Sequence, residues 1–190
     1  MLPISVQLAQ MAYDVAGLHD GPPHSYPAPP RMASTADAMR ELLNFYGRNY
    51  GPILIWAWWA AGIIVGADVR ERILPVWSWS EYPRDLGTQR WLKLFRATGY
   101  VSDSHLAPSE PITLYRGAVE SRRRGMSWTT DPIVAERFAA RRPILVRGRI
   151  VYRQRQVWQV TIPPKAVLAR IEGRQESEVI VNPRMLPRDW

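Results

Sequence analysis

The first half of the chain carries apolar residues at helical spacing. This spacing predicts a short helix within 1–16 and a second helix after Ser34, with the hydroxyl of Ser34 or Thr35 as the N-cap. The run Ile53–Ala67 has no charged residue and predicts one buried helix, because about 15 residues are fewer than the roughly 20 that span a bilayer. Trp91, Leu94 and Phe95 predict a further helix over Arg90–Thr98.

Beyond Gly99 the apolar spacing changes to that of β-strands. One helix interrupts the strands, with Asp131 as its N-cap and Pro132 as its first residue. Helices followed by a mostly antiparallel sheet define the α+β class. The predicted strands are Ile112–Ala118, Gly125–Thr130, Ile144–Tyr152, Val157–Pro163, Ala166–Ile171 and Glu176–Val181.

These patterns divide the chain into three parts. Paired prolines between Gly17 and Ser34 interrupt any helix and are typical of a linker, so residues 1–34 are expected to form a flexible N-terminal segment. Residues 35–110 form a helical region rich in tryptophan, and residues 111–190 form the β domain.

Composition narrows the chemistry. The 190 residues include no cysteine, which excludes disulfides, thiolate zinc sites and a cysteine nucleophile. The three histidines are too few and too scattered for a metal site, so no metal is expected. A net charge of +8, almost all arginine, favours an anionic partner such as a dinucleotide, although codon bias would produce the same composition. The N-terminus lacks the basic region of a signal peptide, and we expect a cytoplasmic protein.

Three clusters in the β domain carry candidate chemistry. Arg116 lies in a strand interior beside Gly117, where a ligand or another backbone can approach closely. Ser127 and Thr129 alternate onto one strand face, where their hydroxyls can orient a carboxylate or a ribose. Each cluster alone also fits an ordinary strand in contact with water.

The third cluster is a pair of glutamates. Glu176 and Glu178 share a strand face at a spacing of about 6.5–7 Å. Carboxylates at such a spacing suit chemistry at a sugar anomeric carbon, where a cationic oxocarbenium must be stabilised. The alternative is a solvated acidic strand end in a basic protein.

In this order, the clusters resemble the Arg…Ser-x-Ser/Thr…Glu-x-Glu signature of mono-ADP-ribosyltransferases of the arginine-directed branch. The matching stretches are Leu114–Gly117, Ser127–Thr129 with the helix over 131–139, and Glu176–Val181. The resemblance implies an ADP-ribosyltransferase-like split antiparallel β-sandwich with one intervening helix. The arginine-rich, lysine-poor composition is also similar to that of uncharacterised proteins of actinobacteria and their phages.

The resemblance implies that NAD is the cosubstrate. Arg116 would hold an NAD phosphate or the nicotinamide ribose, with Tyr115 and Gly117 beside it. Ser127 would orient the catalytic glutamate, and Thr129 would support the same face. These five residues are the expected NAD-binding set.

The same resemblance assigns the two glutamates. Glu178 would hydrogen-bond the ribose 2′-hydroxyl and stabilise the cationic transition state as nicotinamide leaves. Glu176 would activate the acceptor, an arginine side chain of an unidentified protein. With Arg116 and Ser127 they complete the expected catalytic set.

Three other functions compete with this prediction. A catalytically inactive relative would act as a protein-binding module, for instance a phage factor that acts on a host protein. An NAD glycohydrolase would use the same residues and accept water. A nucleic-acid binder would use arginine runs such as Arg122–Arg124, but the sequence holds no recognised binding motif, so nucleic acid is not expected as a partner.

Overall fold

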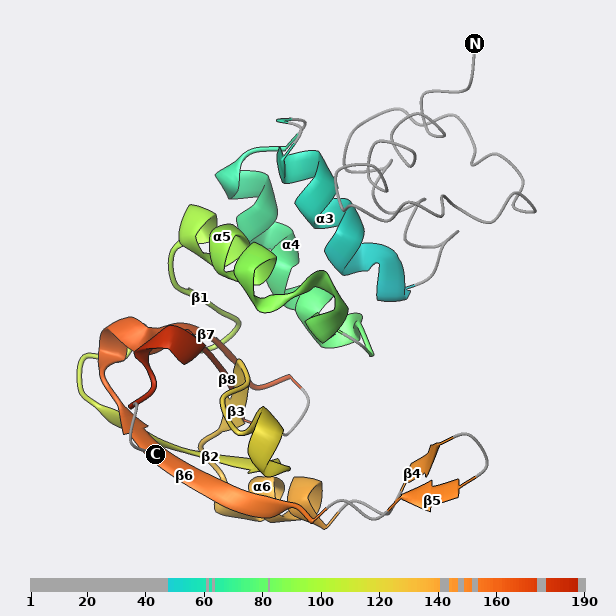
Figure 1. Cartoon of the computed structure of the whole chain (residues 1–190). Coiled ribbons are helices and arrows are strands. Elements are labelled where there is room, and N and C mark those ends of the chain that lie inside the picture. Colours follow the sequence, from blue (N-terminus) through green and yellow to red (C-terminus); the bar gives the residue numbers. More distant parts are fainter. Residues whose placement is uncertain are drawn as a thin grey trace. The chain divides into compact units, whose positions relative to one another are not determined.

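The computed structural model describes residues 48–60, 62, 64–81, 83–140, 144–146, 149–151, 154–173 and 177–187. The chain divides into two units, Met1–Gly99 and Tyr100–Trp190 (Figure 1). The helices predicted within 1–16 and directly after Ser34 lie outside the described residues.

Three helices make up most of the described part of the first unit: α3 (Gly51–Ala60), α4 (Gly66–Trp79) and α5 (Thr88–Thr98). Short 3₁₀ turns η1 (Arg48–Tyr50) and η2 (Pro83–Leu86) accompany them. The helix predicted over Arg90–Thr98 is confirmed as α5.

Aromatic side chains form the core of this helical unit. The ring centroids of Trp77 and Trp91 lie 4.9 Å apart in an edge-to-face arrangement. Phe95 packs against both rings, and Trp58 of α3 is fully buried. None of the helices in the described ranges is long and apolar enough to cross a membrane.

The prediction of one helix over Ile53–Ala67 is wrong, because the run divides between α3 and α4. α3 ends at Ala60, and the following turn is closed by a hydrogen bond from the Gly62 N–H to the Trp59 carbonyl (3.1 Å). α4 then begins with the Asp68 carboxylate accepting the Val65 N–H (2.9 Å). Hydropathy alone does not reveal this second start, because the sequence stays apolar through the turn even though Gly62 and Val65 are exposed.

The second unit contains a six-stranded sheet with the order β1-β7-β8-β3-β2-β6. All neighbouring strands are antiparallel except β1 and β7, which are parallel. Helices before a largely antiparallel sheet fit the α+β class. The strands are β1 (Val101–Ser102), β2 (Ile112–Ala118), β3 (Ser127–Thr129), β6 (Gln156–Ile162), β7 (Val167–Ile171) and β8 (Glu178–Val181).

Two further strands, β4 (Ile144–Val146) and β5 (Arg149–Val151), form a separate antiparallel pair. The single strand predicted over Ile144–Tyr152 is therefore wrong. Gly148, a residue type that favours tight turns, stands between the two strands in the sequence. The described strands thus form one large sheet and one hairpin, and the expected split sandwich stays a prediction.

One face of the large sheet packs on a hydrophobic cluster. Its members come from β2, β3, β6, β7, β8 and the segments that follow β6 and β8, and they are Leu114, Trp128, Val160, Ile162, Ala166, Val167, Val179, Val181 and Leu186. The short turns η4 (Pro164–Ala166) and η5 (Pro183–Met185) contribute to this side. The opposite face is also buried where it carries Thr129, Ala169 and Ile180.

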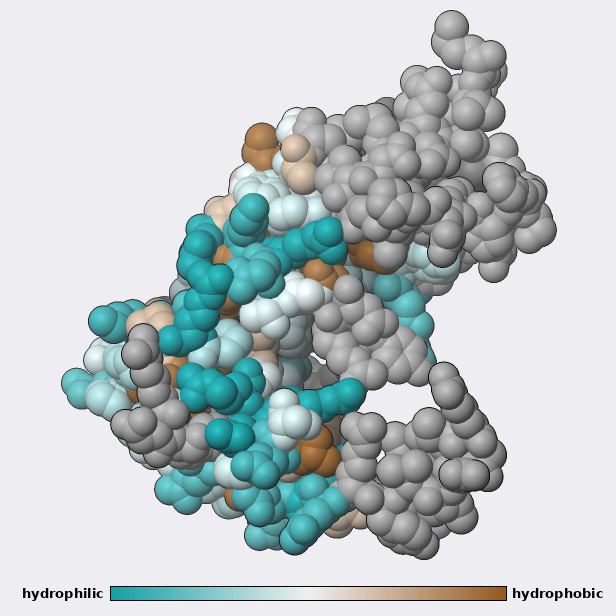
Figure 2. Space-filling view, in the orientation of Figure 1, coloured by the Kyte–Doolittle hydropathy of each residue, from teal (hydrophilic) through white to brown (hydrophobic). Residues whose placement is uncertain are grey.

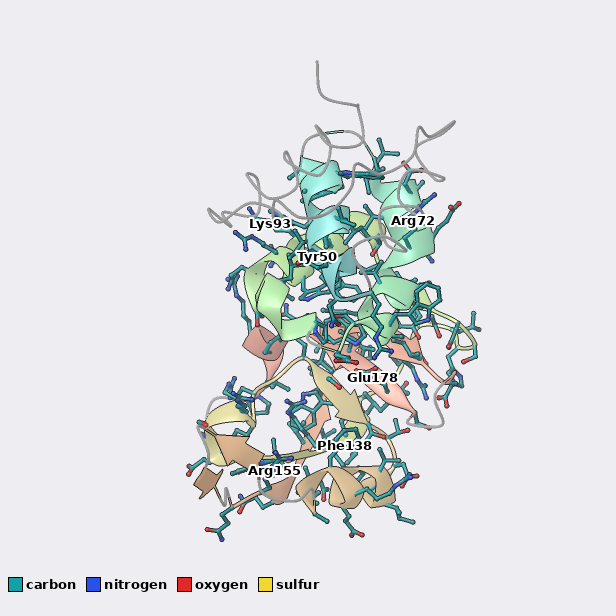
Figure 3. The ribbon with its side chains drawn as sticks, turned by 90° about the vertical axis from the view of Figure 1, so that its right-hand side faces the viewer. Tyr50, Arg72, Lys93, Phe138, Arg155 and Glu178 are labelled. Atoms are coloured by element: carbon teal, nitrogen blue, oxygen red, sulfur yellow. The ribbon has the colours of Figure 1, made fainter. Side chains whose placement is uncertain are left out.

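The helix α6 (Pro132–Ala139) lies against β2 and β6 (Figure 1). The predicted N-cap is confirmed, because an Asp131 carboxylate oxygen accepts the Ile133 N–H at 2.8 Å. At its other end, the Arg155 Nη1 donates to the Phe138 carbonyl at 3.3 Å, and both residues are labelled in Figure 3. These contacts hold α6 at both ends.

The described surface visible in Figure 2 is largely hydrophilic, with scattered hydrophobic residues. Large apolar side chains that are exposed come from separate elements: Val65, Trp79, Leu106, Ile133 and Val157. Single exposed apolar residues of this kind are common on protein surfaces.

Candidate functional site

The three clusters that the sequence singled out lie on strands that are neighbours in the sheet. Arg116 is on β2, Ser127 and Thr129 are on β3, and Glu178 begins β8. The sheet order β8-β3-β2 makes β3 the central strand of the three. Residues up to 62 positions apart in the sequence (178 minus 116) are therefore brought onto adjacent strands.

Three of these side chains form a row across the strands. Thr129 pairs with Tyr115 on β2 and with Glu178 on β8. Directly opposed residues of antiparallel strands project on the same face, so Tyr115, Thr129 and Glu178 share one face of the sheet. Ser127 lies two residues before Thr129 and belongs to that face as well.

Arg116 lies on the other face. It follows Tyr115 by one residue and pairs with Trp158 of β6, whose ring packs on the hydrophobic cluster. The sequence predicts that Arg116, Ser127, Thr129 and Glu178 point into one cleft between two small sheets, whereas the strand pairing places Arg116 on the opposite face of the sheet from the other three. The sequence pattern fixes the alternation within each strand but not the register between strands.

The Arg116 guanidinium binds backbone carbonyls. Its Nε donates to the Arg122 carbonyl at 3.2 Å, and its Nη1 donates to the Ser127 carbonyl. A Cβ at Gly125 would lie 2.5 Å from Nη2, so the chain at Gly125 passes directly against this group. Arg116 therefore holds the segment between β2 and β3 against β2.

The electrostatics of Arg116 link it to Glu178. Burial lowers the pKa of Arg116 to about 10, while the negative charge of Glu178 raises it and the positive charge of Arg122 lowers it further. A guanidinium with this pKa stays protonated at neutral pH. The two residues thus interact through their charges even though their strand positions lie on opposite faces.

Gly117 is the site of a close approach, and the approaching backbone belongs to α6. A Cβ at position 117 would lie 2.1 Å from the Ala135 carbonyl oxygen and 2.4 Å from the Ala139 nitrogen. Only glycine leaves room for the helix at this distance. From the sequence, either a ligand or another backbone could explain this glycine. In the structure the backbone of α6 is what approaches it.

Thr129 connects the row to α6. Its side chain is 5% exposed, and its hydroxyl oxygen accepts the Asp131 N–H at 3.1 Å. Glu178 is half-buried at the start of β8, and Figure 3 labels it on that strand. Glu176 lies outside the described residues.

A polar cluster beside Glu178 was not predicted. We call it the Glu172 cluster: Asp103, His105, Glu172 and Ser177. Ser177 Oγ donates to Glu172 Oε2 (3.1 Å), while His105 Nε2 lies 2.9 Å from Glu172 Oε1. The Asp103 carboxylate accepts the Glu172 N–H at 3.1 Å. The pair Asp103 and Glu172 is 69 residues apart, and no local pattern predicts such a contact.

Hydrogen bonds keep the Asp103 carboxylate charged. Burial alone would raise its pKa, but the N–H of Glu172, the hydroxyl of Ser104 and the N–H of Gly173 together lower it below the ordinary value of 3.8. Within the described ranges, no three His, Asp, Glu or Cys side chains are arranged to hold a metal ion.

Comparisons of the chain with known proteins add no information about its fold or its candidate site. No family model, no curated protein and no solved structure matches it.

Proposed function

We propose that the unit Tyr100–Trp190 binds NAD, cleaves its nicotinamide–ribose bond and transfers ADP-ribose to a protein side chain with a guanidinium group. One observation carries this proposal: Tyr115, Thr129 and Glu178, one residue from each cluster of the signature, form a row on one face of the adjacent strands β2, β3 and β8. Residues that act on one substrate must converge in space.

The roles follow from charge and position. Glu178 presents a carboxylate to the oxocarbenium that forms as nicotinamide leaves. Thr129 lies opposite it on β3 and Tyr115 lies one strand further on β2, on the same face, where they would contact the ribose. Arg116 carries a positive charge that would attract a phosphate, and its Nε and Nη1 also bind backbone carbonyls.

A specific observation favours a second candidate, the inactive protein-binding module. The hydrogen bonds of Arg116 to the carbonyls of Arg122 and Ser127 are those of a structural arginine. An arginine with this role alone would leave NAD without its expected phosphate partner.

Calorimetric titration with NAD, followed by a nicotinamide-release assay, tests the proposal. Binding of NAD together with release of nicotinamide, increased by free arginine as acceptor, supports a transferase. Release that arginine does not change, without labelled product, identifies an NAD glycohydrolase. Neither binding nor release would overturn the proposal in favour of the binding module.

A further inference from the structure

The residue before Glu178 has an unusual backbone conformation. Ser177 has a φ of +43°, and it is the one non-glycine residue with positive φ among those that the structure describes. A residue with a Cβ rarely adopts this left-handed conformation, because the Cβ approaches the following carbonyl. Neighbouring contacts must therefore hold Ser177 in place.

Two hydrogen bonds hold Ser177. Its Oγ donates to Glu172 Oε2 at 3.1 Å, and its carbonyl oxygen accepts the Thr130 N–H at 3.3 Å. The second bond extends the pairing of β3 with β8 by one step beyond the Thr129–Glu178 pair. The side chain and the main chain of Ser177 are thus held from opposite directions.

Glu172 is itself fixed. Its N–H and that of Gly173 donate to the Asp103 carboxylate at 3.1 and 3.2 Å. His105 Nε2 lies 2.9 Å from its other carboxylate oxygen, and Arg170 Nη2 lies 3.8 Å from the same oxygen. The loop that follows β1 therefore holds Glu172, and Glu172 holds Ser177.

The pairing of the strands transmits this arrangement to Glu178. Ile171, the last residue of β7, pairs with Glu178, the first residue of β8. The chain leaves the sheet at Glu172, directly after β7, and returns to it at Ser177, directly before β8. The backbone of Ser177 consequently sets the direction in which Glu178 enters the strand.

The order of the contacts argues against a nucleophilic serine. In a serine hydrolase the histidine contacts the serine hydroxyl directly and takes its proton. Here the carboxylate of Glu172 stands between Ser177 and His105. This arrangement fixes the position of Ser177 and does not activate its hydroxyl.

We propose that Glu172 is a positioning residue for Glu178. It holds Ser177 in its left-handed conformation and thereby aims the Glu178 carboxylate along the face that carries Thr129. This role rests on the proposed function where it concerns catalysis, whereas the structural coupling of Glu172 to Ser177 and Thr130 is independent of it.

The experiment compares Glu172→Ala with the matched control Glu110→Ala, an exposed glutamate in the loop before β2. Amide hydrogen exchange is measured at Thr130, whose N–H donates to Ser177. We expect exchange at Thr130 to rise about tenfold in Glu172→Ala, the effect of losing a hydrogen bond to a charged group, and to stay unchanged in Glu110→Ala. Unchanged exchange in both variants would overturn the coupling.

A second variant tests whether Glu172 acts by holding the left-handed conformation of Ser177 or only by making the turn before β8 more rigid. Glycine adopts positive φ without a steric penalty, so Ser177→Gly added to Glu172→Ala should restore most of the protection at Thr130. If the extra glycine leaves exchange as fast as in Glu172→Ala alone, the left-handed conformation is not what Glu172 maintains, and the proposal is wrong.

The catalytic arm uses nicotinamide release from the same proteins. We expect Glu172→Ala to lower kcat about tenfold with KM nearly unchanged, because a misdirected Glu178 loses interaction in the transition state, and Ser177→Gly to recover most of kcat. A rise in KM alone would contradict the positioning role. If the wild-type protein releases no nicotinamide, the proposed function fails while the exchange at Thr130 still decides the coupling.

Discussion

Thr129 and Glu178 stand directly opposite each other on β3 and β8, so their side chains project on the same face of the sheet. Thr129 is almost fully buried, and its hydroxyl accepts the N–H of Asp131. The carboxylate proposed to act on NAD therefore lies beside a residue that also fixes the start of α6.

The two glutamates are predicted to have different roles. Glu178→Gln should abolish detectable nicotinamide release, because it removes the charge that faces the oxocarbenium, an effect of about 10²–10³ in rate. Glu176→Gln should preserve slow NAD hydrolysis and lose transfer, because its role is to activate the acceptor. Nicotinamide release and transfer of labelled ADP-ribose to arginine are measured for both variants. Equal and small effects would mean that the pair is only a solvated acidic strand end.

Thr129 is predicted to stabilise the start of α6 through its hydroxyl. Thr129→Val keeps the shape of the side chain and leaves the Asp131 N–H without this acceptor, at a cost of about 1 kcal/mol in the free energy of unfolding. Amide exchange at Asp131 should become faster in Thr129→Val. Thr129→Ser keeps the hydroxyl and serves as the control, and equally fast exchange in both variants would contradict the assignment.

Gly117 is predicted to tolerate no side chain. In Gly117→Ala the new methyl group meets the Ala135 carbonyl at 2.1 Å, so α6 must move, and the free energy of unfolding should fall by about 1–3 kcal/mol. Gly173→Ala is the matched control, because its Cβ would lie 3.6 Å from Asp103 Oδ2, an ordinary contact. Urea denaturation of both variants gives the comparison, and equal stabilities would refute the close packing of α6 on β2.

Asp103 is predicted to stabilise the fold in a pH-dependent manner. Its pKa is lower in the folded protein than the ordinary 3.8, so its contribution is fully present above the unfolded value and is lost as the pH falls through the folded pKa. Wild type should therefore be more stable than Asp103→Asn at neutral pH, and the difference should shrink below about pH 4. Urea denaturation of both proteins from pH 7 down to pH 3 measures it. A difference that stays constant over this range would show that the charge of Asp103 does not matter.

The sequence by itself determined the elements whose signals are local. Asp131 and Pro132 mark the start of α6, and strand-like spacing marks β2, β6 and β7 close to their observed bounds. It did not reveal the division of Ile53–Ala67 into two helices. The run stays apolar through the turn, although Gly62 and Val65 are exposed there, so hydropathy gives no signal of the break.

Only the tertiary structure decided how the strands meet. The alternation along β2 places Tyr115 and Arg116 on opposite faces, but the pairing of Tyr115 with Thr129 decides which of them joins Glu178. A shift of one residue in register would exchange them. Register depends on the packing of the whole hydrophobic cluster, which a single strand does not encode.

The contacts of the Glu172 cluster were likewise decided only by the tertiary structure. The sequence around these residues is typical of loops. No local pattern predicts a contact between Asp103, His105 and Glu172. The parallel pairing of β1 with β7 brings the loop after β1 to the end of β7. The sequence therefore specified Glu178 as a candidate catalytic residue. The fold brought the Glu172 cluster next to it in the sheet, because contacts between distant segments form only when the sheet is complete.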